Sequence, residues 1–486
     1  MKKIKPVVVI GAGPAGMGAA IELVKADVPC MMIDEAPRPG GQVYRQPPTK
    51  FQTQEKYKLN SEQKRGKDLY TQWLEVKDKV NLLSSTSVVG IWNEKEVIYS
   101  SEGISGIIEA EQIIIATGAY ERPVPFPGWT LPGVMTVGGV KSFIKTMFVK
   151  PGKQAVIAGT GPLLISTANR LHEIGVNVMA ILEAGNPPWT SGAFSKEWQE
   201  VDFAQDIAND LEELKGNNIP LLFNHTIFEA HGKSEVTSVT YGEVDAKDWK
   251  PLNDTKRTIN ADLVALGFGF VSNTELSMLA GCRHDFHPGI GWYIVRNEMM
   301  ETTVPGIFSV GDGALIGGAI IAEQEGRIAG IKAAQNAGAI TAGDAEKYFE
   351  KHLSRLHSFK SFRISINEAT AMRKGLLYLP KVETLVCRCE EVVFSDVNTA
   401  IKEGAGDLQS VKLLTRLGMG PCQGRNCASS MGMYLCETLK KTPEQIGRIN
   451  SRPPVKPVTL GALAKMINAE EELSNPFDAI TAGGRI

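Results

Sequence analysis

Residues 7–45, VVVIGAGPAGMGAAIELVKADVPCMMIDEAPRPGGQVYR, contain the pattern that decides the fold. Four apolar β-forming residues run directly into glycines spaced as G-x-G-x-x-G, and a helix-forming segment follows. In such a unit the first glycine allows a tight turn, the second lets the backbone approach a pyrophosphate, and the third lets helix and strand pack closely. The phosphates then face the positive N-terminus of the helix. The residues predicted to contact a dinucleotide here are Gly11, Gly13, Pro14, Ala15 and Gly16.

A second apolar strand, expected over residues 30–33, ends in the acidic pair Asp34 and Glu35. Asp34 follows Gly16 by 18 residues, a spacing at which a carboxylate can accept a hydrogen bond from a ribose hydroxyl. Strand, glycine turn, helix, strand and acid occur in the order that dinucleotide binding requires. The sequence therefore predicts a βαβ dinucleotide-binding unit, far more specifically than three glycines alone would.

Residues 37–45, PRPGGQVYR, resemble the segment after the ribose-binding acid in two-dinucleotide-domain flavoproteins of the glutathione reductase type. The resemblance implies FAD rather than NAD at this first site. Two later segments resemble the other FAD signatures of that group, and in the second of them the aspartate is implied to bind the ribityl or phosphate region. The N-terminus of the next helix is implied to face the flavin's pyrimidine edge. The further contacts implied are Glu35, Gly41, Gln42, Arg45, Ala116, Thr117, Gly118, Gly311 and Asp312.

The spacing of motifs reveals an internal repeat. Gly11 and Gly118 are 107 residues apart, while Gly159 and Gly267, in a second strand–glycine–helix pattern, are 108 apart. Two unrelated segments would not be expected to keep this spacing. The chain is therefore predicted to hold two copies of one α/β nucleotide-binding architecture, and the candidate contacts of the second copy are Gly159, Gly161 and Glu183.

The second copy has Leu164 where the first has Gly16. We expect a leucine here to push helix and strand apart and to crowd the helix N-terminus where a pyrophosphate would lie. Three interpretations stay open for this half: a degenerate structural domain, a site for ATP or ADP, and functional NAD(P)H binding. FMN at this site or at a subunit interface is a further alternative.

Four of the seven cysteines cluster late in the chain, as C-R-C-x32-C-x4-C. Four thiolates suit a [2Fe–2S] cluster or a Zn(Cys)4 site, and the C-x-C pair is tighter than the usual zinc spacing. A one-electron carrier is also the more useful partner for a flavin, so we favour [2Fe–2S] over zinc or a disulfide. The segment resembles the small helical [2Fe–2S] domain of bacterioferritin-associated ferredoxin. The predicted ligands are Cys387, Cys389, Cys422 and Cys427.

The combination of GGQVYR, GTGPLL and CRCEE…TRLGMGPCQGRNC is similar to the large (alpha) subunit of bacterial multisubunit amine and imino-acid dehydrogenases. That family includes opine oxidase, hydroxyproline dehydrogenase and hydrogen cyanide synthase types. The resemblance implies a separately encoded FAD-dependent subunit that oxidises the amine, a small third subunit in some members, and an acceptor such as a quinone. No catalytic residue of this chain is assigned. The domains expected are 1–122 with 285–345 for FAD, 123–284 for the second nucleotide fold, 346–380 as a connecting segment, 381–450 for [2Fe–2S], and a tail over 451–486.

Bulk composition excludes several other classes of protein. The 486 residues are 43% hydrophobic with a net charge of −2, which gives no electrostatic reason to expect nucleic-acid binding. No apolar run is long enough for a membrane helix, so we expect a cytoplasmic protein, membrane-associated only through partners. The segments where disulfide reductases carry a redox cysteine pair, residues 35–60 and 120–200, hold no cysteine. The alternatives left are a self-contained NAD(P)H-dependent FAD/iron–sulfur oxidoreductase and a noncatalytic scaffold or redox-sensing subunit.

Overall fold

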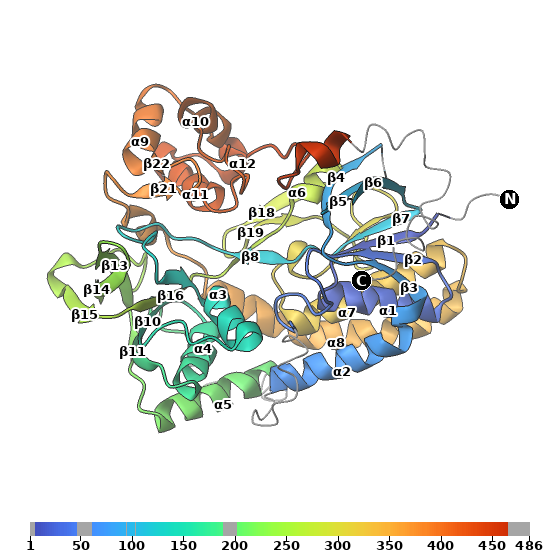
Figure 1. The fold of residues 1–486 in the computed structure, drawn as a ribbon, viewed down its shortest axis with the longest axis horizontal. Coiled ribbons are helices and arrows are strands. Elements are labelled where there is room, and N and C mark those ends of the chain that lie inside the picture. Colours follow the sequence, from blue (N-terminus) through green and yellow to red (C-terminus); the bar gives the residue numbers. More distant parts are fainter. Residues whose placement is uncertain (1–4, 46–60, 94, 103, 188–201, 465–486) are drawn as a thin grey trace.

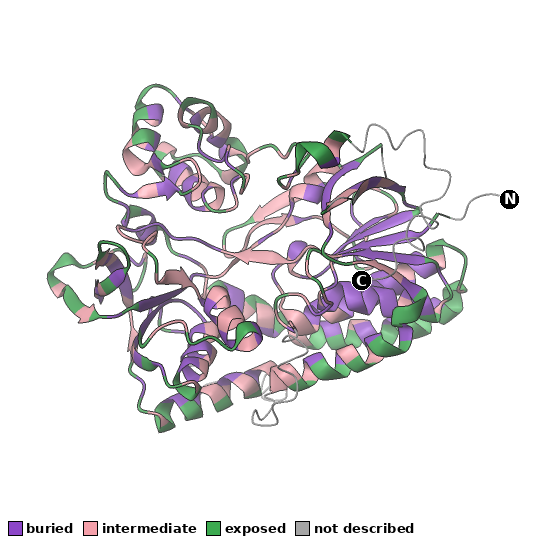
Figure 2. Ribbon diagram, viewed as in Figure 1, coloured by how far each residue is buried: buried purple, intermediate pink, exposed green. Residues whose placement is uncertain are grey.

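The computed structural model describes residues 5–45, 61–93, 95–102, 104–187 and 202–464. Figure 1 shows two α/β bodies side by side, with a smaller helical domain above the second body. In Figure 2 the strands of both main sheets are buried, while the outer helices carry exposed faces. None of the helices in the described ranges has the length and apolar composition that crossing a bilayer requires.

The first body is built on a five-stranded parallel sheet in the order β20-β7-β1-β2-β3. Its strands are β1 (Val7–Ile10), β2 (Cys30–Ile33), β3 (Val80–Leu83), β7 (Gln112–Ile115) and β20 (Ile307–Ser309). Side chains alternate between the two faces of a strand, so Val7 and Val9 pack into the helix layer while Val8 and Ile10 face the opposite side. The helices are α1 (Pro14–Lys25), α2 (Ser61–Val76) and α7 (Ala319–Asn336), and the opposite face is covered by the antiparallel strands β4 (Ser87–Trp92), β5 (Glu96–Ser101) and β6 (Ile104–Glu109).

The second body repeats this plan, with a parallel sheet in the order β12-β11-β10-β16-β9. The strands are β9 (Val134–Thr136), β10 (Gln154–Gly159), β11 (Asn177–Glu183), β12 (Leu221–Phe223) and β16 (Leu263–Gly267). Its helices are α3 (Val137–Ser142), α4 (Pro162–Glu173) and α5 (Asp202–Gly216), and its antiparallel layer is β13 (His225–Gly232), β14 (Val236–Glu243) and β15 (Arg257–Asn260). The predicted duplication is confirmed, since β1, β2, β3 and β7 match β10, β11, β12 and β16 in position.

Two short strands carry the chain between the bodies. β8 (Ala119–Glu121) leaves the first body and β17 (Phe270–Ser272) returns to it, and the two pair antiparallel. The returning chain forms α6 (Glu275–Leu279) and the hairpin β18 (His284–His287) with β19 (Gly291–Ile294). The segment predicted as a connection is mostly one long helix, α8 (Ala342–Ala369), which packs beside α7 and reaches the second body through Phe362 and Ile366. No composition signal had marked this helix.

The C-terminal domain contains β21 (Leu385–Cys387), β22 (Val392–Val393) and the helices α9 (Phe394–Lys402), α10 (Leu408–Thr415), α11 (Ala428–Leu439) and α12 (Pro443–Ile446). Its core is continuous with the antiparallel face of the second body. Trp129 Nε1 donates to Leu385 O at 2.7 Å, and the buried Arg122 donates to Ser429 Oγ at 3.0 Å. The predicted tail then returns to the first body, where Val455 is buried and its N–H bonds to Val89 O at 2.9 Å.

Candidate dinucleotide sites and thiol cluster

The first glycine turn presents bare backbone at the start of α1. Gly11 has φ +106°, and a Cβ on it would lie 2.3 Å from Ala116 O. A Cβ on Gly16 would lie 1.8 Å from Gly11 O, so helix and strand are as close as the sequence predicts. Any side chain at either position would displace the turn, and the N-terminus of α1 therefore stays open to an anionic group.

The acid at the end of β2 is held by the turn itself. Asp34 Oδ2 accepts from Ala12 N at 2.5 Å and Oδ1 accepts from Ala36 N at 2.6 Å. Burial raises the pKa of this carboxyl, while the hydrogen bonds from Ala12 and Ala36 oppose that rise. The neighbouring Glu35 is exposed and forms an ion pair with Lys456 at 2.8 Å. Both carboxylates thus lie at the mouth of the turn, where the adenosine half of a dinucleotide would lie.

The segment after the acid folds back onto the glycine turn. Gly40 N donates to Ala12 O at 2.8 Å, and a Cβ on Gly41 would lie 2.8 Å from Gly13 Cα. Gln42 is exposed, and Arg45 is partly buried. This arrangement explains the glycine pair, because the two backbone segments approach more closely than side chains would permit.

The two later signatures meet beside the start of α1. A Cβ on Gly313 would lie 2.9 Å from Thr117 Oγ1, and one on Gly311 would lie 3.1 Å from Ala15 Cβ. Asp312 Oδ1 accepts from Gly317 N at 2.8 Å and from Gly318 N at 2.7 Å, which orders the turn before α7. Segments distant in sequence are therefore gathered around one groove end.

A buried ion pair fixes the Gly311 turn. Glu325 Oε2 accepts from Gly311 N at 2.7 Å and from Arg296 Nη1 at 2.9 Å. Its Oε1 accepts from Arg296 Nη2 at 2.5 Å, and both side chains are at most 10% exposed. Sequence reasoning missed both residues, since neither belongs to a recognisable motif.

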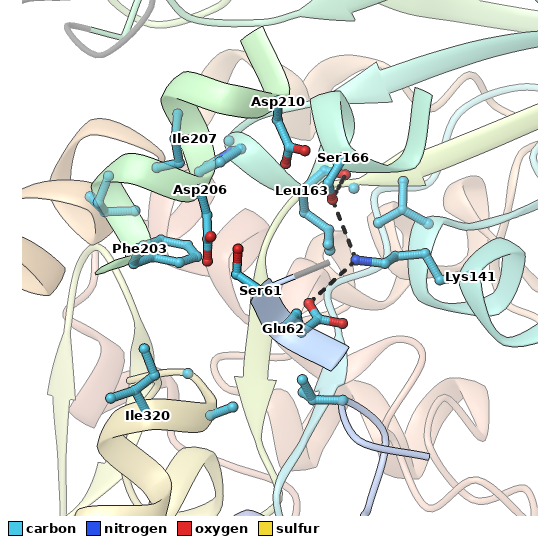
Figure 3. A pocket seen from close by; sticks show the side chains of 18 of the residues that line it. Ser61, Glu62, Lys141, Leu163, Ser166, Phe203, Asp206, Ile207, Asp210 and Ile320 are labelled. Atoms are coloured by element: carbon cyan, nitrogen blue, oxygen red, sulfur yellow. Dashed lines mark hydrogen bonds and ion pairs between the residues drawn. The ribbon is translucent and has the colours of Figure 1, made fainter. Parts of the chain in front are cut away.

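A cavity of about 540 Å³ lies between the two bodies. Its walls include the first turn of α7, the second glycine turn, and residues from α2, α3, α5 and α8. Figure 3 shows Lys141 directed at Glu62 and Ser166 within it. Against the effect of burial, Lys141 and Lys145 lower the pKa of Glu62 to about 2, and burial lowers the pKa of Lys145 to about 8. The cavity therefore holds fixed charges of both signs.

The second glycine turn is closed by protein side chains. Leu164 is 1% exposed and lies so close to β16 that a Cβ on Gly267 would be 2.8 Å from Leu164 Cδ2. A Cβ on Gly161 would be 3.1 Å from Thr370 Cγ2, so the end of α8 covers this turn. Glu183 accepts from Gly161 N at 2.8 Å and from Gly185 N at 3.0 Å, and burial raises its pKa. Gly159, Gly161 and Glu183 thus come together as the repeat predicts, around a turn filled by leucine.

The four late cysteines converge in the C-terminal domain from two loops. Cys387 Sγ lies 4.0 Å from Cys389 Sγ, and Cys389 Sγ lies 3.6 Å from Cys422 Sγ. Hydrogen bonding with Cys427 lowers the pKa of Cys387 to about 5, whereas burial raises that of Cys389 to about 12. The contacts form a chain in the order Cys427, Cys387, Cys389, Cys422. Within the described part of the protein, no group of three or more His, Cys, Asp or Glu side chains is arranged to hold a metal ion.

Comparison with known proteins gives matches over nearly the whole chain. A family model described as pyridine nucleotide-disulphide oxidoreductase matches residues 5–339, and one described as the sarcosine oxidase A3 domain matches residues 381–466. Hydrogen cyanide synthase subunit HcnB of Pseudomonas aeruginosa is 34% identical over 465 residues, covering 94% of this chain and 98% of that protein. An opine oxidase subunit of Agrobacterium tumefaciens is 31% identical, covering 94% and 91%.

Solved structures share the architecture. L-proline dehydrogenase from P. horikoshii has a TM-score of 0.67 at 20% identity and covers 95% of this chain and 81% of that chain. Thioredoxin reductase of Lactococcus lactis has a TM-score of 0.51 at 19% identity, with coverage of 69% and 100%. These two likenesses establish the fold alone. The long family match and the similarity to HcnB place the chain in the pyridine nucleotide-disulphide oxidoreductase family, among the relatives of HcnB and of the opine oxidase subunit, and it is an oxidoreductase.

Proposed function

We propose that this chain is the FAD- and [2Fe–2S]-containing electron-transfer subunit of a multisubunit dehydrogenase that acts on a CH–NH donor. The substrate is a secondary amine or imino acid of the opine or hydroxyproline class. A separately encoded FAD-dependent subunit oxidises its C–N bond to an imine, and a quinone or similar acceptor takes the electrons. The observation that carries this proposal is the presence, in one chain related along its length to HcnB and to an opine oxidase subunit, of both a dinucleotide turn and four converging thiols.

The residues around the first turn fit FAD. Gly11 and Gly16 leave no room for side chains, so the N-terminus of α1 is free to receive the pyrophosphate. Asp34 and Glu35 lie at the adenosine end, and Asp312 lies toward the cavity at the flavin end. A cavity of about 540 Å³ is in the usual size range for a small-molecule or cofactor site.

The thiols fit a binuclear cluster better than a single tetrahedral ion. They form two close pairs, Cys387 with Cys427 and Cys389 with Cys422, and each iron of a [2Fe–2S] centre takes two thiolates. Zinc would require all four sulfur atoms around one point. Bound FAD would accept electrons in pairs, while the cluster would release them singly.

The rival NAD(P)H-dependent function is disfavoured by the second turn. Leu164 and Thr370 occupy the space that a pyrophosphate and its approach would need. ATP, ADP or FMN, at this half or at a subunit interface, are the remaining second-nucleotide alternatives. We assign the protein to the cytoplasm, where reduced thiols are maintained for cluster assembly.

Anaerobic purification, with and without the proteins encoded by neighbouring genes, tests the proposal. We expect the chain to contain FAD together with iron and acid-labile sulfide in equal amounts, and amine-dependent dye reduction to require the partner subunit. Full substrate turnover by the chain alone would contradict the partner claim. Zinc in place of iron would contradict the electron-transfer role.

A further inference from the structure

The cavity between the two bodies contains a buried cation without a counter-charge. Arg363 projects from α8 into the cavity wall, close to the first turn of α7. Its Nη1 lies 4.0 Å from the position that a Cβ on Gly318 would take. Within the described part of the chain, its Nε is buried without a hydrogen-bond partner, and no carboxylate forms an ion pair with the guanidinium.

The nearest acidic group does not neutralise this arginine. Asp312 acts on it only at longer range, and Asp312 Oδ1 is already occupied by Gly317 N and Gly318 N. The 18-residue helix α7 directs its N-terminus to the same place and adds a partial positive charge. Burying a guanidinium beside a helix N-terminus is costly unless an anionic group lies between them.

The geometry of the first body determines which group reaches this point. A pyrophosphate at the start of α1 lies beside Gly311, since a Cβ there would be 3.1 Å from Ala15 Cβ. Asp34 and Glu35 hold the adenosine side, so the other half of the dinucleotide must extend past Asp312. Asp312, Gly318 and Arg363 line one cavity in that direction.

We propose that Arg363 and the first turn of α7 together bind the pyrimidine side of the flavin ring, where reduction places a negative charge. This inference rests on the FAD binding proposed above. Two electrons and one proton enter the ring, and one negative charge remains on the side that faces the guanidinium. Arg363 stays protonated throughout and transfers no proton. It is therefore a positioning residue that raises the flavin reduction potential by stabilising the reduced form.

The test is the flavin midpoint potential of the full-length holoprotein, measured by anaerobic reductive titration against a reference dye. Arg363→Gln removes the charge, and we expect reduction to become about tenfold less favourable or more, equivalent to about 30 mV for two electrons. Arg363→Lys should lose less, because a charge remains. Arg355→Gln removes an arginine from the exposed face of the same helix and should leave the potential unchanged.

The outcomes separate the two proposals. Arg363→Gln protein with bound flavin and an unchanged or higher potential would overturn this inference and leave FAD binding intact. Wild-type protein without flavin would overturn the proposed function itself. If Arg363→Gln does not fold or loses flavin, Arg363→Lys decides: a potential below that of the wild type supports the inference, and one equal to it contradicts the inference.

Discussion

Cys389 Sγ lies 3.6 Å from Cys422 Sγ although 33 residues separate them. The loop that carries Cys422 approaches this closely because of Gly420, where a Cβ would lie 2.4 Å from Cys389 Sγ. The C-terminal fold therefore brings thiols of two loops into contact, as a shared centre requires.

Cys389→Ser and Cys422→Ser are each expected to abolish iron binding, because each removes one thiolate from the pair proposed to hold one iron. Iron, acid-labile sulfide and the visible spectrum should fall together, while FAD content stays at the wild-type level. Cys436→Ser in α11 serves as control and should retain iron. Iron content unaffected by Cys389→Ser would remove these cysteines from the ligand set.

Leu164→Ala is expected to lower the free energy of unfolding by roughly 2–5 kcal/mol, since the side chain is 1% exposed and packs against β16. Leu163→Ala alters the neighbouring, partly exposed leucine and should cost clearly less. Urea unfolding of both variants gives the comparison. Equal losses for the two substitutions would show that Leu164 does not fill the space beside the second glycine turn.

NADH added anaerobically should leave the absorbance of the oxidised flavin unchanged. The physical reason is steric, since Leu164 and Thr370 take the space around the second turn that a pyrophosphate would need. Stopped-flow absorbance measures the reaction, with dithionite as the positive control for reducibility. Rapid bleaching by NADH at substoichiometric protein would restore the self-contained NAD(P)H-dependent function.

Glu325→Gln is expected to destabilise the first body by about 3–5 kcal/mol, because it leaves the buried Arg296 without its charged partner. It should also weaken FAD retention, since Glu325 holds Gly311 N at 2.7 Å. Glu437→Gln breaks an exposed pair with Lys440 and should cost less than about 1 kcal/mol. Thermal unfolding and flavin release on dilution report the two effects, and similar values for both variants would contradict the expectation.

The stability of the protein should fall as the pH drops from 6.5 toward 4. Burial lowers the pKa of His352 from 6.5 to about 4, so in this window the unfolded chain binds a proton that the folded chain does not. The stabilisation is complete above pH 6.5 and is lost as the pH falls to 4. His352→Asn, which can still donate to Gln324, should make the dependence shallower, whereas the exposed His357→Asn should not. Unfolding free energies at a series of pH values provide the measurement.

The first glycine turn could be predicted because its requirements are local. Gly11 and Gly16 are needed by the contact of one strand with the helix that follows it, and Asp34 bonds back to the same turn. The duplication could be predicted for a related reason, since equal spacings in sequence reflect equal supersecondary units. Contacts from residues without a motif could not be foreseen, and these include Lys456 on Glu35 and Glu325 on Gly311.

The sequence by itself determined the βαβ units, their repetition and the four thiols, because strand, turn and helix preferences act between residues close together in the chain. Only the tertiary structure decided that α8 crosses from one body to the other, closes the second turn with Thr370 and places Arg363 beside α7. The reason is physical: burial and charge compensation depend on every segment packed around a group. That environment is a property of the assembled fold.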